Sequence, residues 1–288
     1  MLAVLQFKAQ KAAKNILINI DTKRGNMAKF LSLFSGSSGN STYVGDGTAG
    51  ILIDAGKTAK QLAEALRARE IDPAGLSALF ITHEHGDHAQ GLRVFSSKFN
   101  VPVYATEGTI KGLKKRGYID EKTQIYPLKR EMEIEGLKIT PFPVSHDTYE
   151  PCGYSVFTAD ERKFTICTDT GVLTEQSRQA LSGSNVVILE SNHELSMLLN
   201  GPYPYPLKMR VSGAKGHLSN DDCARELVRL VQGGTTGLYL GHLSRENNTP
   251  EIAEQSALSA LQIAGLKRGF DFELGILPPV NNKKAVIF

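Results

Sequence analysis

The fold of this chain is decided by the stretch LFITHEHGDH, which occupies residues 79–88. Its first four residues form an apolar strand pattern, and a helical pattern begins near Ala89. Three of the seven histidines in the chain fall within residues 83–88. Imidazole and carboxylate groups are the usual ligands of zinc and related divalent ions. A polar loop with chance histidines does not explain this concentration, so we interpret the stretch as the centre of a metal site.

The spacing of residues within this stretch predicts two sets of ligands. Side chains alternate in an extended segment, so His83 and His85 point the same way and can hold one ion. Glu84 should point away from that ion. Asp87 and His88 follow the glycine turn and can face a second ion. The helical H-E-x-x-H zinc pattern is excluded, because the fourth residue after His83 is an aspartate.

Short apolar strands recur on both sides of this stretch, with helical patterns between some of them, which predicts an α/β domain. The expected strands are Phe30–Phe34, Ile51–Ile53, Ala78–Ile81, Val101–Tyr104, Lys138–Pro143, Phe164–Cys167, Val186–Leu189 and Gly237–Leu240. The expected helices are Thr58–Glu70, Ala89–Phe99, Gly108–Arg116, Leu173–Ser182, Asn220–Gln232 and Pro250–Ala264.

Six of the strands end at residues that can do chemistry. In layered α/β folds, functional groups gather where strands give way to loops, so these endings predict one shared site. A lone histidine is more often structural, and the shared placement is what makes the later histidines credible ligands. The six residues are Asp54, His83, His146, Asp169, Glu190 and His242.

Composition is that of an ordinary globular protein of 288 residues, with 41% apolar and 22% charged residues. No apolar run approaches the ~18 residues that span a bilayer. Residues 1–26 lack the continuous apolar stretch of a signal peptide. Because Met27 directly precedes a strand pattern, we expect residues 1–26 to be an extension outside a domain formed by residues 27–288.

Cysteine usage and net charge say little about partners. The three cysteines form no C-x-x-C pattern, so neither a disulfide framework nor a cysteine zinc site is indicated, and a cytoplasmic location fits best. A net charge of +3 is weak evidence for a polyanionic partner. No membrane or protein partner is indicated, and assembly into a homo-oligomer is left open.

The H-x-H-x-D-H element, the later lone histidine and aspartate, and the late Leu240-Gly241-His242 together resemble the metallo-β-lactamase superfamily. This resemblance runs from about Met27 to the C-terminus and implies a four-layer αβ/βα sandwich. It also implies two divalent metal ions, and a His/Asp set suits zinc, manganese or iron. The implied ligands are His83, His85 and His146 for one ion, Asp87, His88 and His242 for the other, and Asp169 as a bridge. Asp54 would orient the ligand loop without binding metal.

Two ions ~3.5–4 Å apart would supply a bridging hydroxide as nucleophile and would bind the substrate oxygen that gains charge. Glu190 and the segment GHLSN at residues 216–220 are similar to elements of the ribonuclease Z branch. That similarity implies His217 as general acid with Glu190 beside it, which would assist the departure of a poor alkoxide leaving group. The alternative is that His217 caps its helix and Glu190 forms a structural ion pair.

A combination of five segments resembles the YycJ/WalJ family of bacteria, which is associated with 5′-to-3′ exonuclease activity on DNA. They are SGSSGNS at 35–41, ESNH at 190–193, NGPYPYPLKMR at 200–210, GHLSN at 216–220 and LGHLSRENN at 240–248. Pro206 departs from the expected pattern, which has an aromatic or polar residue there. The resemblance implies a dinuclear phosphodiesterase acting on DNA. A small-molecule metallohydrolase (thioesterase, lactonase or cyclic-nucleotide phosphodiesterase) is the alternative, and a metal-binding protein without catalysis is a third class.

Candidate substrate contacts lie mostly in residues 200–217. Tyr203 and Tyr205 can stack on bases, and three basic residues that follow can hold phosphates. A proline-stiffened loop with solvated charges explains this segment equally well. The turn at residues 37–41 can bind phosphate or simply form a tight hairpin. The remaining candidates for substrate binding are Lys208, Arg210, Lys215, His193, Ser38 and Asn40.

Overall fold

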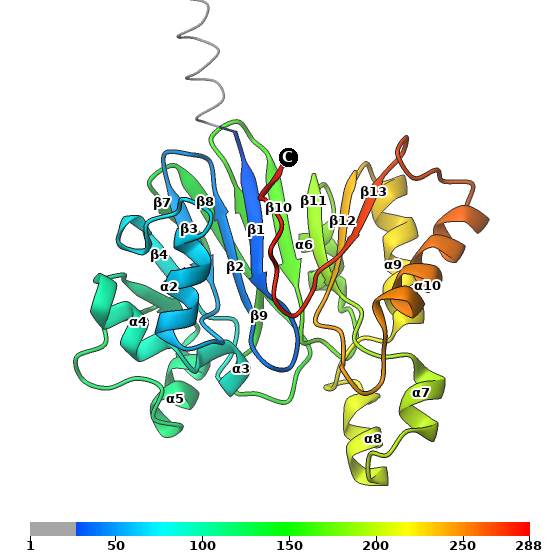
Figure 1. Ribbon diagram of the computed structural model, residues 1–288, viewed down its shortest axis with the longest axis horizontal. Coiled ribbons are helices and arrows are strands. Elements are labelled where there is room, and N and C mark those ends of the chain that lie inside the picture. Colours follow the sequence, from blue (N-terminus) through cyan, green and yellow to red (C-terminus); the bar gives the residue numbers. More distant parts are fainter. Residues whose placement is uncertain (1–26) are drawn as a thin grey trace, which may run out of the picture.

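The computed structural model describes residues 27–288, and the predicted extension at residues 1–26 lies outside this part of the chain. Two seven-stranded sheets face each other (Figure 1). The first contains, in order, β14 (Val286–Ile287), β1 (Lys29–Phe34), β2 (Ser41–Gly45), β3 (Gly50–Ile53), β4 (Ala78–Phe80), β5 (Val103–Ala105) and β6 (Ile125–Pro127). The second contains β13 (Glu273–Ile276), β12 (Gly237–Gly241), β11 (Val186–Glu190), β10 (Lys163–Cys167), β9 (Cys152–Phe157), β8 (Leu137–Pro143) and β7 (Met132–Ile134).

Helices cover the outer face of each sheet, so the predicted αβ/βα sandwich is confirmed (Figure 1). The helices on the first sheet's side are α2 (Ala59–Arg67), α3 (Gly86–Ala89), α4 (Leu92–Phe99) and α5 (Glu107–Lys115), with a 3₁₀ turn at Pro73–Gly75. On the second sheet's side are α6 (Glu175–Leu181), α9 (Asn220–Gln232) and α10 (Pro250–Ile263). A pair of short helices, α7 (Leu195–Asn200) and α8 (Tyr205–Val211), projects beside the sandwich.

Successive side chains of each central strand pack alternately into two different hydrophobic cores. In β3, Ile51 and Ile53 join the core between the sheets, whereas Leu52 joins the core beneath α2 and α4. In β11, Ile188 faces the inner core and Leu189 packs under the helices of the second sheet. Strands that are covered on both faces must be apolar at every position, which is why they read as continuous hydrophobic runs.

Two predicted elements differ from the observed ones. The predicted helix Ala89–Phe99 corresponds to α4, which begins only at Leu92, whereas the preceding α3 starts at Gly86 and ends at Ala89. Gly91 lies between the two helices, where an added Cβ would lie 2.0 Å from the carbonyl oxygen of Lys57. The segment at residues 200–210, for which a proline-stiffened loop is one of the two interpretations of the sequence, contains the helix α8. Pro206 lies in the first turn of that helix, where a missing N–H breaks no helical hydrogen bond.

The topology brings the carboxyl ends of several strands to one edge of the sandwich. β3 runs parallel to β4, and β10, β11 and β12 are parallel neighbours in the other sheet. The loops that leave these strands therefore meet at the same edge, as their sequence endings predict. Among residues 27–288, no helix has the length and apolarity needed to cross a bilayer.

Candidate functional site

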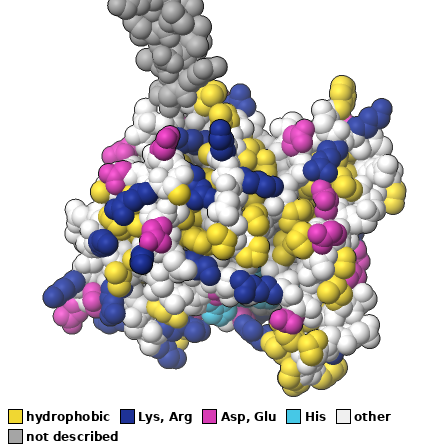
Figure 2. Space-filling model, in the orientation of Figure 1, with side chains coloured by type: hydrophobic (Ala, Val, Ile, Leu, Met, Phe, Trp, Pro, Cys, Tyr) yellow, Lys and Arg dark blue, Asp and Glu magenta, His cyan; other side chains and the backbone are white. Residues whose placement is uncertain are grey.

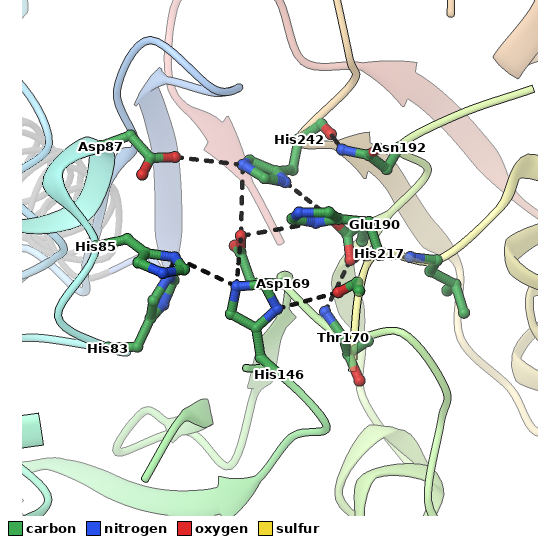
Figure 3. A network of polar contacts seen from close by, with 12 residues as sticks. His83, His85, Asp87, His146, Asp169, Thr170, Glu190, Asn192, His217 and His242 are labelled. Atoms are coloured by element: carbon green, nitrogen blue, oxygen red, sulfur yellow. Dashed lines mark hydrogen bonds and ion pairs between the residues drawn. The ribbon is translucent and has the colours of Figure 1, made fainter. Parts of the chain in front are cut away.

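Three residues at this edge have a left-handed backbone within two residues of the end of a strand. The φ angles are 65° for Asp54, 56° for Asp169 and 55° for His242. A non-glycine residue in this region is strained by about 1–3 kcal/mol and persists where the surrounding structure enforces it. Such strain clusters at functional sites, and two of these residues, Asp169 and His242, come from separate strands and lie side by side in the candidate site (Figure 3).

The first group of converging side chains consists of His83, His85 and His146. The Nδ1 atom of His85 lies 3.1 Å from Nε2 of His83 and 3.3 Å from Nε2 of His146. Nitrogen ligands placed tetrahedrally around zinc at ~2.0–2.1 Å would be separated by roughly 3.3 Å, so the spacing fits a shared ion. Burial, followed by repulsion from neighbouring histidines, lowers the pKa of His83 well below its usual value and that of His85 to about 4. Neutral imidazoles with free lone pairs are what a metal requires.

The second group consists of Asp87, His88 and His242. The Oδ2 atom of Asp87 lies 3.5 Å from Nε2 of His88 and 3.6 Å from Nε2 of His242. His88 and His242 are buried, whereas Asp87 is partly exposed at the mouth of the site. The mixture of one carboxylate and two imidazoles again matches the preferences of zinc, manganese and iron.

Asp169 lies between the two groups. Its Oδ2 atom is 3.3 Å from Nε2 of His88, and its Oδ1 atom is 3.5 Å from Nε2 of His242 and 4.0 Å from Nε2 of His146. The Oδ2 atom of Asp169 and the Nε2 atom of His242 are buried without a hydrogen-bond partner. Buried polar atoms are normally satisfied, so these two atoms are placed to bind an ion. The structure thus brings together all seven sequence-predicted ligands, and this donor set fits two divalent cations.

Asp54 and Thr82 fix the ring orientation of two candidate ligands. The Nδ1–H of His88 donates to Oδ2 of Asp54 at 2.8 Å, and the backbone N–H and hydroxyl of Thr82 also donate to Asp54. The Oγ1 atom of Thr82 lies 3.0 Å from Nδ1 of His83. With Nδ1 occupied in both rings, Nε2 is the nitrogen that faces the site. The predicted orienting role of Asp54 agrees with these contacts, whereas sequence reasoning missed Thr82.

Asp54→Asn should weaken metal binding about 10- to 100-fold, the usual effect of removing a group that orients metal ligands. The substitution keeps size and shape, and asparagine tolerates the left-handed backbone. It loses one acceptor, so either His88 or Thr82 faces an amide NH₂ group. Competition with a chromophoric chelator measures the affinity, and circular dichroism checks the fold. Unchanged affinity for both ions would show that Asp54 has no orienting role.

Glu190 is buried, and its carboxylate contacts two histidines. Its Oε1 atom accepts hydrogen bonds at 2.8 Å from Nδ1 of His217 and from Nδ1 of His242. Its Oε2 atom accepts from the backbone N–H groups of Thr170 and Leu218. Burial opposes the charge on Glu190, but His217 and His242 outweigh it and hold the pKa of this carboxyl below its usual range. Sequence reasoning linked Glu190 only to His217 and missed its contact with His242.

His217 is more exposed than the neighbouring candidate ligand His242. Its side chain is 16% exposed, compared with 3% for His242. Burial alone would lower the pKa of His217, but the Glu190 carboxylate raises it above the ordinary value. Because Nδ1 donates to Glu190, Nε2 is the nitrogen left to contact a substrate.

Buried asparagines hold together three of the sequence segments that carry the YycJ/WalJ resemblance. The Nδ2 atom of Asn248 donates to the carbonyl of Asn192 and to Oδ1 of Asn220. The Nδ2 atom of Asn192 in turn donates to the carbonyl of His242 at 2.9 Å. These side chains brace the backbone behind the site. Another missed contact is the Gly216 carbonyl, which accepts from Nδ1 of His146 at 3.0 Å and could not be inferred from residue type.

The predicted substrate contacts in residues 200–215 do not all share one environment. Tyr205 is 72% exposed and Tyr203 is half-buried, at the start of α8 and just before it. Lys208 donates to the carbonyl of Leu199, and Arg210 forms two hydrogen bonds with Asp147. Lys215 is exposed on the loop before His217.

The remaining three candidates lie deeper or in the turn after β1. His193 is 1% exposed, and its backbone carbonyl accepts from the N–H of Asn220. Ser38 accepts a hydrogen bond from Arg245, while Asn40 contacts the candidate ligands Asp87 and His88. Substrate contact by all eight candidates stays a prediction.

Facing sheets with a shared His/Asp cluster at one edge define a metal-dependent hydrolase. Residues 50–242 match the family described as the beta-lactamase superfamily domain. The metallo-β-lactamase-fold protein YhfI of Bacillus subtilis has a similar structure, with a TM-score of 0.64 at 15% identity over 89% of this chain and 98% of that one. At this identity the likeness concerns the fold alone.

Two curated relatives show to which family within this superfamily the chain is similar. Exodeoxyribonuclease WalJ of Streptococcus pneumoniae is 34% identical over 250 residues, covering 85% of this chain and 93% of the relative. Exodeoxyribonuclease YycJ of Bacillus anthracis is 35% identical over 248 residues, with the same coverage of both chains. The chain belongs to the WalJ/YycJ family of the metallo-β-lactamase superfamily, which confirms the resemblance predicted from its sequence.

Proposed function

We propose that this protein is a dinuclear-metal phosphodiesterase that degrades DNA as a 5′-to-3′ exonuclease, with His217 as general acid. The observation that carries the proposal is the Glu190–His217 pair beside the seven-residue cluster. The Nδ1 atom of His217 is 3.9 Å from Oδ1 of Asp169, and its ring centroid is 5.3 Å from that of His242. A hydrolase of esters with good leaving groups has little need for such an acid.

Each group of residues in the site has a separate role in the proposed reaction. When bound, two divalent ions would lower the pKa of a shared water and neutralise charge on the phosphate. His83, His85 and His146 would hold one ion and Asp87, His88 and His242 the other, with Asp169 between them. His217 would deliver a proton from Nε2 to the departing oxygen, while Glu190 holds the ring through Nδ1.

DNA as the substrate is supported by the names of the two relatives, both of which are exodeoxyribonucleases. The pair α7–α8 adds a physical reason. It carries exposed Tyr205 and also Arg210, whose partner Asp147 adjoins His146. An aromatic face and a basic side chain at the rim are the groups that bind single-stranded nucleic acid.

A substrate panel tests the proposal. Metal-loaded protein is incubated with 5′-phosphorylated DNA labelled at its 3′ end, bis-p-nitrophenyl phosphate, a thioester and a lactone. We expect turnover of both phosphodiesters and release of mononucleotides from the 5′ end of the DNA. Turnover confined to the thioester or the lactone would establish a small-molecule hydrolase instead. Loading with zinc, manganese and iron in separate samples identifies the ions that support activity.

A further inference from the structure

Two basic side chains without carboxylate partners flank the turn that follows β1. This turn, residues 36–40, is closed by a hydrogen bond from the Gly39 N–H to the Gly36 carbonyl. Arg245 reaches it from the loop after β12 and donates to Oγ of Ser38 at 2.8 Å. Lys57 reaches it from the loop after β3. Among residues 27–288, neither Lys57 nor Arg245 has a carboxylate within ion-pair distance, although other arginines such as Arg210 do.

The Lys57 side chain is held in place by close packing. A Cβ added at Gly39 would lie 2.7 Å from both Cδ and Cε of Lys57, so the lysine stem runs directly along the turn. Its Nζ atom lies 5.8 Å from the centroid of the Phe34 ring. Burial and then the nearby Arg245 charge lower the pKa of Lys57. The positive charges of Lys57 and Arg245 thus lie close together, and no carboxylate of the described residues is near enough to pair with either. Such an arrangement is unfavourable because the two charges repel each other.

The same turn leads directly into the candidate metal site. Asn40, two residues after Ser38, places its amide nitrogen 2.9 Å from Nε2 of His88 and 3.3 Å from Oδ2 of Asp87. Two peptide steps span at most ~7 Å, so Ser38 lies next to the candidate metal site. Figure 2 shows basic side chains gathered at the hollow where histidine reaches the surface. A polynucleotide with one phosphodiester at the metal centre would therefore bring a neighbouring phosphate to this turn.

We infer that Lys57, Arg245 and the Ser38 hydroxyl form a phosphate subsite that binds the phosphate next to the scissile one in a nucleic-acid strand. This inference rests on the proposed function and extends it, because it names the residues that distinguish a polynucleotide from a small phosphodiester. Guanidinium and ammonium groups that share one anion are a common arrangement for phosphate binding. The anion also removes the repulsion between the two cations.

The test compares binding and hydrolysis in the double variant Lys57→Gln/Arg245→Gln. Binding to the metal-loaded protein is followed by fluorescence anisotropy of a 20-nucleotide single strand whose phosphorothioate linkages resist hydrolysis. We expect affinity to fall about 10- to 150-fold at low salt, the scale for lost hydrogen bonds to a charged group. The slope of log K against log salt should fall by about 0.7, corresponding to one phosphate contact. Hydrolysis of bis-p-nitrophenyl phosphate, which has no second phosphate, should be unchanged.

Lys60→Gln is the matched control, because its side chain is 84% exposed on α2 and only three residues from Lys57. It should leave the salt slope as in the wild type. If the double variant binds the strand as tightly as the wild type, and the wild type degrades DNA, then the proposed subsite is wrong and the proposed function is unaffected. A parallel loss of bis-p-nitrophenyl phosphate hydrolysis would show that the two cations support the metal site instead. Failure of the wild-type protein to bind or degrade DNA would overturn both proposals.

Discussion

Asp169→Asn is expected to reduce hydrolysis of both DNA and bis-p-nitrophenyl phosphate on the order of 10³-fold or more. Asp169 is the residue whose carboxylate approaches both ligand groups, 3.3 Å from His88 and 4.0 Å from His146. Loss of its charge removes the group that would bring two cations together. The stabilisation that metal ions give a transition state amounts to several kcal/mol, and each 1.36 kcal/mol is a factor of ten in rate.

Asparagine is the informative replacement because it has the size of aspartate and tolerates the φ of 56° at this position. Alanine would add backbone strain to the loss of charge. Elemental analysis should find fewer than two ions per chain, and the thermal unfolding of the metal-free protein should match that of the metal-free wild type. Asp160→Asn, at an exposed turn between β9 and β10, is the control. Retention of two ions together with activity within a few-fold of the wild type would exclude the bridging role.

Local signals in the sequence predict much of the fold and of the ligand set. The alternation of side chains in an extended segment is enough to place His83 and His85 on one side. The strand endings are equally informative, because an apolar strand followed by one polar residue is visible in a few letters. Asp54, Asp169 and His242 are predicted in this way, although their left-handed backbone carries no signal in residue type. Apolar periodicity also locates the strands that are buried on both faces.

Roles that depend on tertiary position carry no such local signal. The Gly216 carbonyl that orients His146 is a backbone atom, so no residue type could reveal it. The contact between Glu190 and His242 joins residues 52 positions apart, from two strands that pair only in the folded sheet. The sequence does not predict helix α8, because three prolines at and just before its start are typical of loops. Pro204 precedes this helix and Pro206 lies in its first turn, and neither position requires an N–H donor.

The position of Glu190 also decides which substitution can test the acid. Glu190 accepts hydrogen bonds from both His217 and His242. Glu190→Gln would therefore disturb a candidate metal ligand as well as the acid, and any loss of rate would have two explanations. His217 makes no such double contact, since its Nδ1 donates to Glu190 alone. The acid is best tested by changing His217 and leaving its partner in place.

His217→Ala should lower the turnover of DNA by ~10²–10⁴-fold, which is the usual contribution of general acid catalysis. The DNA leaving group is a poor alkoxide that needs a proton as its bond to phosphorus breaks. Bis-p-nitrophenyl phosphate expels p-nitrophenolate without protonation, so its turnover should fall far less. Both substrates share the metal centre, so their ratio cancels effects on metal loading. His217→Asn, which keeps a donor for Glu190 but has no acidic proton, should show the same ratio. An equal fall for both substrates, with two ions still bound, would make His217 a binding or structural residue and end its assignment as the acid.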